Sequence, residues 1–310
     1  RATSCSRSQP EWAAPITGLE ANTIRRVARE YATLKPAQLI QGLGPQRHAF
    51  GEQSVRAGIA LACMTGNLGR LGGGWGGGDG LRRLGLPVGG LPVGTNPVQA
   101  SIPVFLWTDA VTHGTLLTES DGVRDGPLSA NIKFIFNLAG NTLINQHADI
   151  NRTKQILKDE GLCEFIVASD HYLTPSARFA DLVLPGDHAL ERYDLGFPWT
   201  GEKYVLFGNK VCEAPGECRN EYWWLSRVAA GMGVGKQFTE GKTEAEWLLR
   251  IIDEARKGDP RFPSFEELSK TGIYRQDPEE YVAFAREIQD PERNPFQTPS
   301  GNIEIFSMRL

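Results

Sequence analysis

The amino-acid sequence predicts an α/β fold: a mostly parallel, Rossmann-like sheet with helices on both faces, in a three-layer αβα arrangement. Two apolar runs of strand length, 132–138 and 163–168, flank a segment with helical spacing, and a shorter run at 181–184 ends at Pro185. A strand, a crossover helix and a second strand form a βαβ unit. Ligands of such sheets bind beyond the carboxyl ends of the strands. This stretch therefore predicts a site for a nucleotide-like cofactor.

Composition places the chain among globular proteins. It has 310 residues, 40% hydrophobic and 23% charged, with a formal net charge of -4. That charge gives no reason to expect a nucleic-acid partner. No apolar run approaches the roughly 18 residues of a membrane span, and residues 1–12 are too polar for a signal peptide. Because the sequence starts without Met and stops abruptly, we expect a piece excised from a longer protein.

The five cysteines do not form a C-x-x-C pair. Cys63 and Cys163 lie in apolar runs, and Cys212 and Cys218 lie six residues apart in a loop-like segment. We therefore expect buried thiols rather than a zinc or iron–sulfur site within this chain.

The first 65 residues read as helix, strand, turn and helix. Helical spacing covers 19–32, a short strand is predicted at 37–41, and a second helix is predicted at 51–64. The strand is followed by a glycine-containing turn, Gly42–Arg47, where backbone could approach an anion. An ordinary turn would have the same pattern, so both interpretations stay open.

Residues 66–94 are rich in glycine, and regular structure here would cost much backbone entropy. They predict either a flexible linker or a loop that orders against a cofactor or a neighbouring domain. Structure is expected to resume at 95–114.

The remainder after Pro185 predicts one short strand and several helices. Thr243 with Glu246, and Ser264 with Glu267, are capping boxes that mark helix starts. The other expected elements are a strand at 204–207, a Trp-rich helix at 221–232, a last helix at 279–288 and a strand-like end at 302–307. Trp223, Trp224 and Trp247 are expected to pack in the core or at a domain contact.

Catalytic motifs are missing from the sequence. It has no G-x-S-x-G, H-E-x-x-H or Walker pattern, and its five histidines are scattered. His188 and Glu191 could share a helix face, but such a pair is common by chance.

The residues that favour ligand binding follow the predicted strands. Gly140 permits close approach of backbone, and Asn145 supplies amide donors and acceptors, as do Asn141 and Gln146. Asp170 follows the second strand, where a carboxylate can accept hydrogen bonds from ribose hydroxyls or a guanine edge. Arg47 could pair with phosphate. Asn145 and Asp170 equally fit a capping role in turns.

Several segments resemble the molybdopterin oxidoreductase superfamily, and within it the dimethyl sulfoxide reductase family. The main ones read AGNTLINQHADINRT (139–153), SDHYLTPSARFADLVLP (169–185) and TPSGNIEIFS (298–307). Four more extend the resemblance over nearly the whole chain: QGLGPQRHAFGEQSVRA (41–57), MTGNLG (64–69), TNPVQASIPVFLWTDA (95–110) and KQFTEGKTEAEWL (236–248).

The resemblance implies the central, cofactor-binding part of a molybdenum-containing catalytic subunit. Such enzymes hold molybdenum in a bis(molybdopterin guanine dinucleotide) cofactor and take an oxygen atom from an S-oxide or N-oxide substrate. Electrons arrive through iron–sulfur clusters, with a [4Fe-4S] cluster expected in an N-terminal region outside this chain. Implied partners are an iron–sulfur electron-transfer subunit and a membrane anchor subunit, on the periplasmic or outer face of the membrane. The molybdenum ligand has no counterpart here, so we expect these 310 residues alone to be inactive.

The resemblance also assigns cofactor contacts. Leu43, Gly44 and Arg47 match one cofactor-contacting loop, while Asn145, Ser169 and Asp170 match contacts to the second dinucleotide. No catalytic residue and no metal ligand is assigned. We expect the end of a first α/β cofactor-binding domain at 1–65, a Gly-rich loop and connector at 66–130, and a Rossmann-like domain at 131–310. Two alternatives stay open: a selenate or other oxyanion reductase, and a non-catalytic nucleotide-binding or scaffold module.

Overall fold

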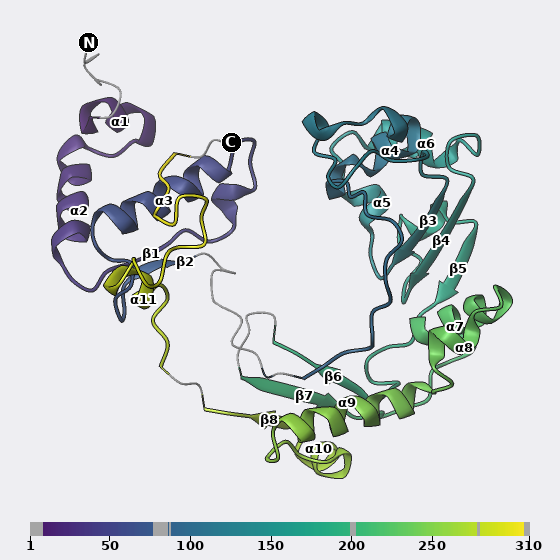
Figure 1. Cartoon of the computed structure of the whole chain (residues 1–310). Helices are drawn as coiled ribbons and strands as arrows, with labels where there is room; N and C mark the ends of the chain where they lie inside the picture. Colours follow the sequence, from purple (N-terminus) through teal and green to yellow (C-terminus); the bar gives the residue numbers. More distant parts are fainter. Residues whose placement is uncertain (1–8, 77–85, 87, 199–202, 278–279, 307–310) are drawn as a thin grey trace. The chain divides into compact units, whose positions relative to one another are not determined.

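Contacts divide the chain into two compact units, each discontinuous in sequence (Figure 1). In this computed structural model the described residues are 9–76, 86, 88–198, 203–277 and 280–306. Unit 1 comprises 1–85, 198–203 and 276–310, and unit 2 comprises 86–197 and 204–275. The domains predicted from the sequence, 1–65, 66–130 and 131–310, are assigned by expected cofactor binding and not by contacts. The two units do not test them, and they remain a prediction.

Unit 1 is built around a two-stranded parallel sheet. Strand β1 pairs with β2 so that Leu39 lies opposite Trp75. The elements of this unit are α1 (Pro10–Thr17), α2 (Ala21–Thr33), β1 (Gln38–Ile40), a 3-10 helix (Gly44–Gln46), α3 (Glu52–Met64), β2 (Gly74–Gly76) and α11 (Ala285–Gln289).

Unit 2 contains the predicted βαβ stretch as a three-stranded parallel sheet. Its strands β3 (Phe134–Leu138), β4 (Phe165–Asp170) and β5 (Leu182–Pro185) lie in that order. Between β3 and β4 the chain forms α5 (Thr142–Asn145) and α6 (Ile150–Lys158), and Asp149 caps α6 by accepting from the Arg152 backbone N–H. The parallel strands and crossover helix of the sequence prediction are confirmed.

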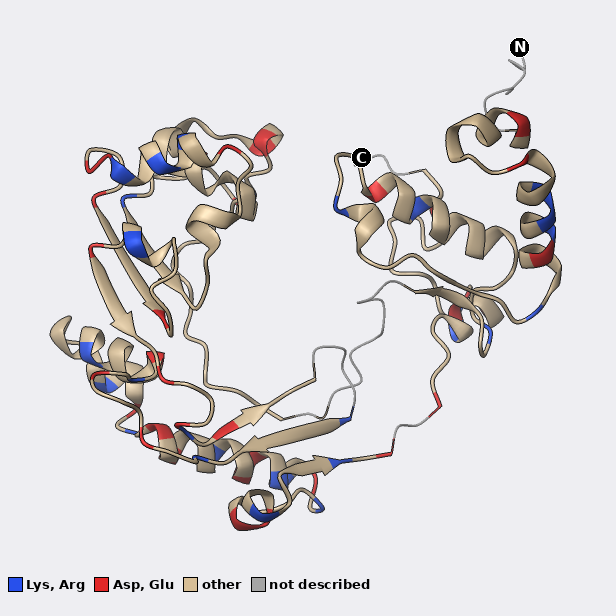
Figure 2. Cartoon of the chain, turned by 180° about the vertical axis from the view of Figure 1, so that it is seen from behind, with Lys and Arg blue, Asp and Glu red and all other residues tan. Residues whose placement is uncertain are grey.

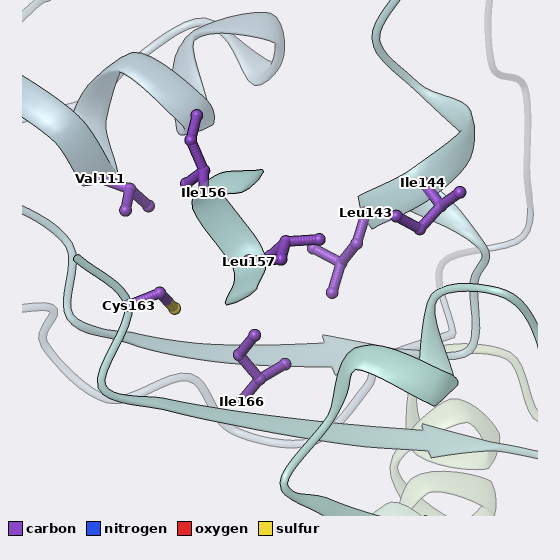
Figure 3. Close-up of a cluster of buried hydrophobic side chains, with 7 residues drawn as sticks. All are labelled: Val111, Leu143, Ile144, Ile156, Leu157, Cys163 and Ile166. Carbon is purple, nitrogen blue, oxygen red and sulfur yellow. The ribbon is translucent and has the colours of Figure 1, made fainter. Parts of the chain in front are cut away.

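One face of this sheet carries the hydrophobic core of the βαβ region (Figure 3). Helix α4 (Trp107–His113) and helices α5 and α6 send apolar side chains toward Ile166 of β4, which is 1% exposed. The buried members are Val111, Leu143, Ile144, Ile156, Leu157, Cys163 and Ile166. Burial raises the pKa of the Cys163 thiol, as expected for an inert core cysteine.

A second, antiparallel sheet completes unit 2. It consists of β6 (Asp194–Gly196), β7 (Tyr204–Gly208) and β8 (Ile273–Arg275), with β7 in the centre. The helices in this part are α7 (Glu221–Gly231), α8 (Gly235–Thr239), α9 (Glu244–Gly258) and α10 (Phe265–Thr271). Val205 and Phe207 of β7 pack with Leu248 and Ile252 of α9 and with Leu268 of α10. Both predicted capping boxes are confirmed at the starts of α9 and α10.

The described elements correct four details of the sequence prediction. The strands form small separate sheets, of which β6–β7–β8 is antiparallel, so one mostly parallel sheet is too simple. The predicted helix 279–288, whose start lies outside the described residues, is reduced to α11, because Phe284 at its N-cap has φ 62°. Residues 302–306 form no strand, and Ser307 lies outside the described residues.

The Gly-rich segment is the fourth correction. Gly74–Gly76 forms strand β2 instead of a linker, because its backbone pairs with β1. The ordering entropy that glycine loses is offset here by tertiary hydrogen bonds, such as Gln41 N–H to the Gly76 carbonyl at 3.1 Å. Residues 77–85 and 87 of this segment lie outside the described residues.

Charged side chains are mixed in sign. Figure 2 shows acidic and basic residues interspersed, as along α9, where Arg250 pairs with Glu254 at 2.8 Å and with Glu240 at 2.9 Å. Among the described helices, none combines the length and apolar character needed to cross a bilayer.

We predict that Ile166→Ala destabilises the protein by about 2–5 kcal/mol, because it removes a fully buried side chain and leaves a cavity. Urea denaturation measures the free energy of unfolding. Leu182→Ala, on the neighbouring strand with the side chain 46% exposed, is the matched control and should cost clearly less. Equal losses in the two variants would contradict the assignment of the core face.

We also predict that Asp259 contributes to acid sensitivity. Its pKa is lowered from 3.8 to about 2, chiefly because the Tyr274 hydroxyl donates to it at 2.7 Å, with further help from Arg261. The ionised form therefore stabilises the fold fully above about pH 4, and this stabilisation is lost as the pH falls toward about 2. Tyr274→Phe should flatten the dependence of thermal stability on pH in this window. Asp253→Asn, an exposed residue of α9, should leave it unchanged.

Candidate functional site

The carboxyl ends of β3, β4 and β5 meet at one edge of the parallel sheet. The register places Leu138 opposite Ser169 and Asp170 opposite Pro185. Small or polar residues mark each strand end: Ala139-Gly140-Asn141 after β3, Ser169-Asp170 at the end of β4, and Gly186-Asp187 after β5. This is the edge at which the sequence analysis predicts a ligand.

The loop after β3 is held in a strained backbone conformation. Ala139 has φ 46°, a left-handed region that residues with a Cβ seldom adopt. Its N–H donates to the Ser169 carbonyl at 2.7 Å, and the Asn137 side-chain amide donates to the Gly140 carbonyl at 2.6 Å. These hydrogen bonds fix the turn, and such strain persists where the surrounding structure over-determines it.

Asn141 ties this loop to the loop after β4. Its Oδ1 accepts from the backbone N–H of Ser176 at 2.9 Å and from the Ser176 hydroxyl at 2.8 Å. The same hydroxyl accepts from the Ile144 N–H at 3.1 Å, and Ser176 is fully buried. We call these three hydrogen bonds the Asn141–Ser176 clamp. The clamp positions α5, and hence Asn145, relative to the end of β4.

The three predicted contacts of unit 2 lie at this edge in different environments. Asn145, at the end of α5, is exposed, and its side-chain amide has no hydrogen-bond partner within the described part of the chain. Asp170 is half-buried, and its Oδ1 accepts from the Tyr172 N–H at 3.2 Å, which is the capping role left open by the sequence. Ser169 has no exposed surface, so contact with its side chain would require the covering residues to move.

Four buried polar atoms of the βαβ region have no partner, and one of them, Ser169 Oγ, belongs to the carboxyl end of β4. They are Ser169 Oγ, Gln146 Oε1, His147 Nε2 and Trp107 Nε1, each unpaired among the described residues. The His147 and Trp107 rings meet edge to face, with centroids 5.4 Å apart. Buried polar groups are normally hydrogen-bonded, so this number within one region calls for an explanation. A polar ligand at the edge, or ordered water, would supply the missing partners.

The other three predicted contacts lie in unit 1, within the turn between β1 and α3. Leu43 is 38% exposed, Gly44 is the exposed first residue of the short 3-10 helix, and Arg47 is exposed at its C-cap. The Arg47 guanidinium makes no ion pair or hydrogen bond within the described residues, so it is available to an anion. Gly42 has φ 65°, which explains the need for glycine at the start of the turn.

Gln41 anchors this turn to the rest of unit 1. Trp75 Nε1 donates to its Oε1 at 2.5 Å, and its Nε2 donates to the Ser54 carbonyl of α3 at 2.9 Å. A Cβ at Gly58 would lie 2.0 Å from the Gln41 Oε1, so a larger residue there would displace the Gln41 amide from its present position. The turn thus projects from a rigid base.

Other candidates from the sequence have structural roles. His188 and Glu191 lie in a turn rather than on a helix face, and the Glu191 carboxylate accepts from the His188 N–H at 2.8 Å. Trp247 is buried, as predicted, and donates through Nε1 to the Tyr222 hydroxyl at 2.9 Å. In the described ranges, no group of three or more His, Cys, Asp or Glu side chains is placed to hold a metal ion.

The sequence analysis missed two residues of the edge. Ser176 lies 35 residues from Asn141, and no local pattern reports a hydrogen bond over that separation. The strain at Ala139 is equally hidden, because alanine is not a residue that signals positive φ. A weak signal for the second loop was available in Thr174, whose hydroxyl accepts from the Ala177 N–H in a Ser/Thr turn.

Comparison with known proteins identifies the family. The family model for molybdopterin oxidoreductases matches residues 17–230, a range that includes the turn of unit 1 and the whole parallel sheet of unit 2. The chain belongs to the molybdopterin oxidoreductase family. Membership implies a molybdenum–pterin cofactor, and the exposed, unpaired Asn145 and Arg47 and the unpartnered atoms at the sheet edge fit a polar, anionic group of that kind.

Two relatives within the molybdopterin oxidoreductases are similar along nearly the whole chain. Dimethyl sulfoxide reductase DmsA of Escherichia coli (strain K12) is 44% identical over 307 residues, which are 97% of this chain and 38% of that protein. Dimethyl sulfoxide/trimethylamine N-oxide reductase of Rhodobacter capsulatus is 32% identical over 327 residues, again 97% of this chain and 38% of that protein. The chain therefore spans 38% of the length of these relatives.

Among solved structures, acetylene hydratase from Pelobacter acetylenicus aligns with a TM-score of 0.46 and 26% sequence identity. The alignment covers 66% of this chain and 24% of that one.

We predict that Asn141→Ala destabilises the protein by about 1–3 kcal/mol, because it leaves the buried Ser176 N–H and hydroxyl without their acceptor. Urea denaturation of the wild type and the variant tests this. Asn151→Ala, which removes an exposed side chain of α6, is the control and should change stability by no more than about 0.5 kcal/mol. The clamp has no energetic role if the two variants unfold alike.

Proposed function

We propose that this chain is the cofactor-holding part of the catalytic subunit of a molybdenum-dependent reductase of S-oxides and N-oxides. The observation that carries the proposal is the 44% identity to dimethyl sulfoxide reductase DmsA across 97% of the chain. The similarity to a dimethyl sulfoxide/trimethylamine N-oxide reductase supports the same substrate class. The carboxyl edge of the parallel sheet supports a role in holding the cofactor.

In this proposal the cofactor is a bis(molybdopterin guanine dinucleotide), and the two polar loops hold its nucleotide ends. The Asp170 carboxylate uses Oδ1 to cap the Tyr172 N–H, which leaves Oδ2 to accept hydrogen bonds from a ribose or a guanine edge. The Asn145 amide, exposed and unpaired among the described residues, would serve as donor and acceptor beside it. Leu43 and Gly44 would bring the unit 1 turn against the other dinucleotide, with the Arg47 guanidinium on its phosphates.

These residues bind and orient rather than react. When bound, the molybdenum centre would supply two-electron oxygen-atom transfer from the substrate, with electrons delivered through iron–sulfur clusters that include a [4Fe-4S] centre. The Ser169 hydroxyl is buried at the end of β4 and has no hydrogen-bond partner among the described residues. It would gain a partner if the loop after β4 rearranged around the cofactor. We assign no catalytic residue to this chain.

The finer fold is also a proposal. Residues of β3–β5 that alternate with the core-facing ones point to the opposite face, where Phe134 is 56% exposed and Phe165 42% exposed. These two rings stack with centroids 6.2 Å apart. Apolar surface of this size favours a second covering layer, which would complete a Rossmann-like three-layer arrangement.

We propose that the full-length protein works with an iron–sulfur electron-transfer subunit and a membrane anchor subunit. Its place would then be at the periplasmic or outer face of the membrane. This part of the proposal rests on the resemblance to the dimethyl sulfoxide reductase family and on the similarity to DmsA. Co-purification of the two subunits with the tagged full-length protein from membranes would support it.

We predict that Asp170→Asn lowers cofactor retention in the full-length protein about tenfold, because charge-assisted hydrogen bonds from the carboxylate are lost. The protein is expressed anaerobically with molybdate, and molybdenum, released guanine nucleotide and dimethyl sulfoxide reduction are measured. Asparagine keeps an oxygen that can cap the Tyr172 N–H, so stability should change little. Loss of retention with unchanged stability separates a ligand role from a cap.

The matched control is Asp149→Asn. Asp149 caps α6 through Oδ1 and lies outside the proposed contacts, so its variant should keep both molybdenum and guanine nucleotide. Wild-type protein that contains no molybdenum would sink the proposed function. Wild-type levels of cofactor in Asp170→Asn would instead leave the function standing and remove Asp170 from the site.

A further inference from the structure

A cavity of about 760 Å³ lies in unit 2, beyond the end of β5. It is bordered by the segment 187–193, by the start of α7, and by α9 and α10. None of the six proposed cofactor contacts lines it. A volume of this size is typical of small-molecule sites.

Much of the cavity wall is apolar. It includes Trp223 of α7, Leu248 and Leu249 of α9, and Phe265 of α10. Trp223 is 36% exposed, and the Arg227 guanidinium covers one part of its ring at 4.7 Å from the centroid. The wall can therefore bury the hydrocarbon body of a ligand.

The basic groups that line the cavity already have partners. Arg192 pairs with Asp187 at 2.5 Å and with Asp194 at 3.1 Å, and Lys210 pairs with Glu213 at 2.7 Å. Arg219 donates to the Gly216 and Cys218 carbonyls and lies against Trp223. An anionic ligand would have to displace these contacts.

Glu244 has no ion-pair partner among the described residues, unlike the buried Asp187 carboxylate of the cavity, which pairs with Arg192. Glu244 stands in the first turn of α9, half-buried, and no Lys or Arg of the described residues lies within ion-pair distance. Its hydrogen-bond partner is the side-chain amide of Asn220, whose oxygen caps α7 by accepting from the Trp223 N–H at 2.8 Å. Burial raises the pKa of Glu244, which is the expected cost of a carboxylate without a counter-ion.

The charged residues that line the cavity are mostly acidic. Five acidic residues line the cavity, namely Asp187, Glu191, Glu213, Glu244 and Glu266, against three basic ones, Arg192, Lys210 and Arg219. The pairs Arg192–Asp187 and Lys210–Glu213 cancel, and the lining keeps three carboxylates, those of Glu191, Glu244 and Glu266, against the Arg219 guanidinium. The lining is therefore net negative, and Glu244 is one of its half-buried carboxylates.

We propose that this cavity binds a small organic cation, an alkylammonium or arylammonium ion. Its charged nitrogen pairs with the Glu244 carboxylate, and its apolar body packs between Trp223, Leu248 and Phe265. A cation offsets the net negative charge of the lining, and its ammonium group can donate charge-assisted hydrogen bonds to the carboxylate. This inference is independent of the proposed cofactor contacts.

The test uses the full-length protein and isothermal titration calorimetry with 2-phenylethylammonium as the probe. We expect binding with a Kd of about 1 mM or below. Two comparison compounds with the same phenylethyl group, neutral 2-phenylethanol and anionic 3-phenylpropionate, should each bind at least about tenfold more weakly, since neither can neutralise Glu244.

Glu244→Gln removes the charge and keeps an oxygen that accepts from Asn220, so the variant should fold and lose about tenfold in affinity for the ammonium probe. Glu254→Gln, an exposed residue of α9 paired with Arg250, is the matched control and should bind as the wild type does. Thermal denaturation confirms that both variants are folded. Equal affinity for the three probes, an unchanged Kd in Glu244→Gln, or the absence of binding by the wild type would each overturn the proposal.

Discussion

The parallel pairing of β3, β4 and β5 is the constraint on which the candidate site depends. Because all three strands run in one direction, their carboxyl ends and the loops that follow lie at one edge, with Asp170 opposite Pro185. Packing fixes the sheet from one face through the cluster around Ile166. The Asn141–Ser176 clamp then joins two of the loops above it. The parallel register is what brings Asn141 and Ser176, 35 positions apart in the sequence, within hydrogen-bond distance.

Much of this fold could be predicted because its signals are local. Apolar runs of strand length and capping boxes each act over a few residues, and strands β3 and β4 and the boxes at Thr243 and Ser264 are confirmed. The failures have tertiary causes. Strand β2 forms in a Gly-rich segment because β1 offers a partner, and α11 begins late because the backbone at Phe284 takes a positive φ. Neither cause is visible in residue spacing.

The site was predictable to the level of loops but not of contacts. The rule that ligands bind beyond carboxyl strand ends leads to Asn145 and Asp170 directly, and both lie at that edge. The rule does not reveal that Ser169 is buried beneath it, that Asn141 is occupied by Ser176, or that Ala139 is strained. Those facts depend on which loop covers which residue, and that is decided by packing between segments far apart in sequence.

A capping role and a ligand-binding role at Asp170 are compatible with each other, although the sequence presents them as alternatives. A carboxylate has two oxygens, and the hydrogen bond from the Tyr172 N–H occupies Oδ1 at 3.2 Å. That bond restricts the side chain to a narrow range of rotamers, so less conformational entropy would be lost if Oδ2 accepted a hydrogen bond from a ligand. The Asn141–Ser176 clamp has the same effect on the loop that presents Asn145. A capping role at this edge is therefore compatible with the proposed role in binding, since the hydrogen bonds that cap the turns also position the polar groups.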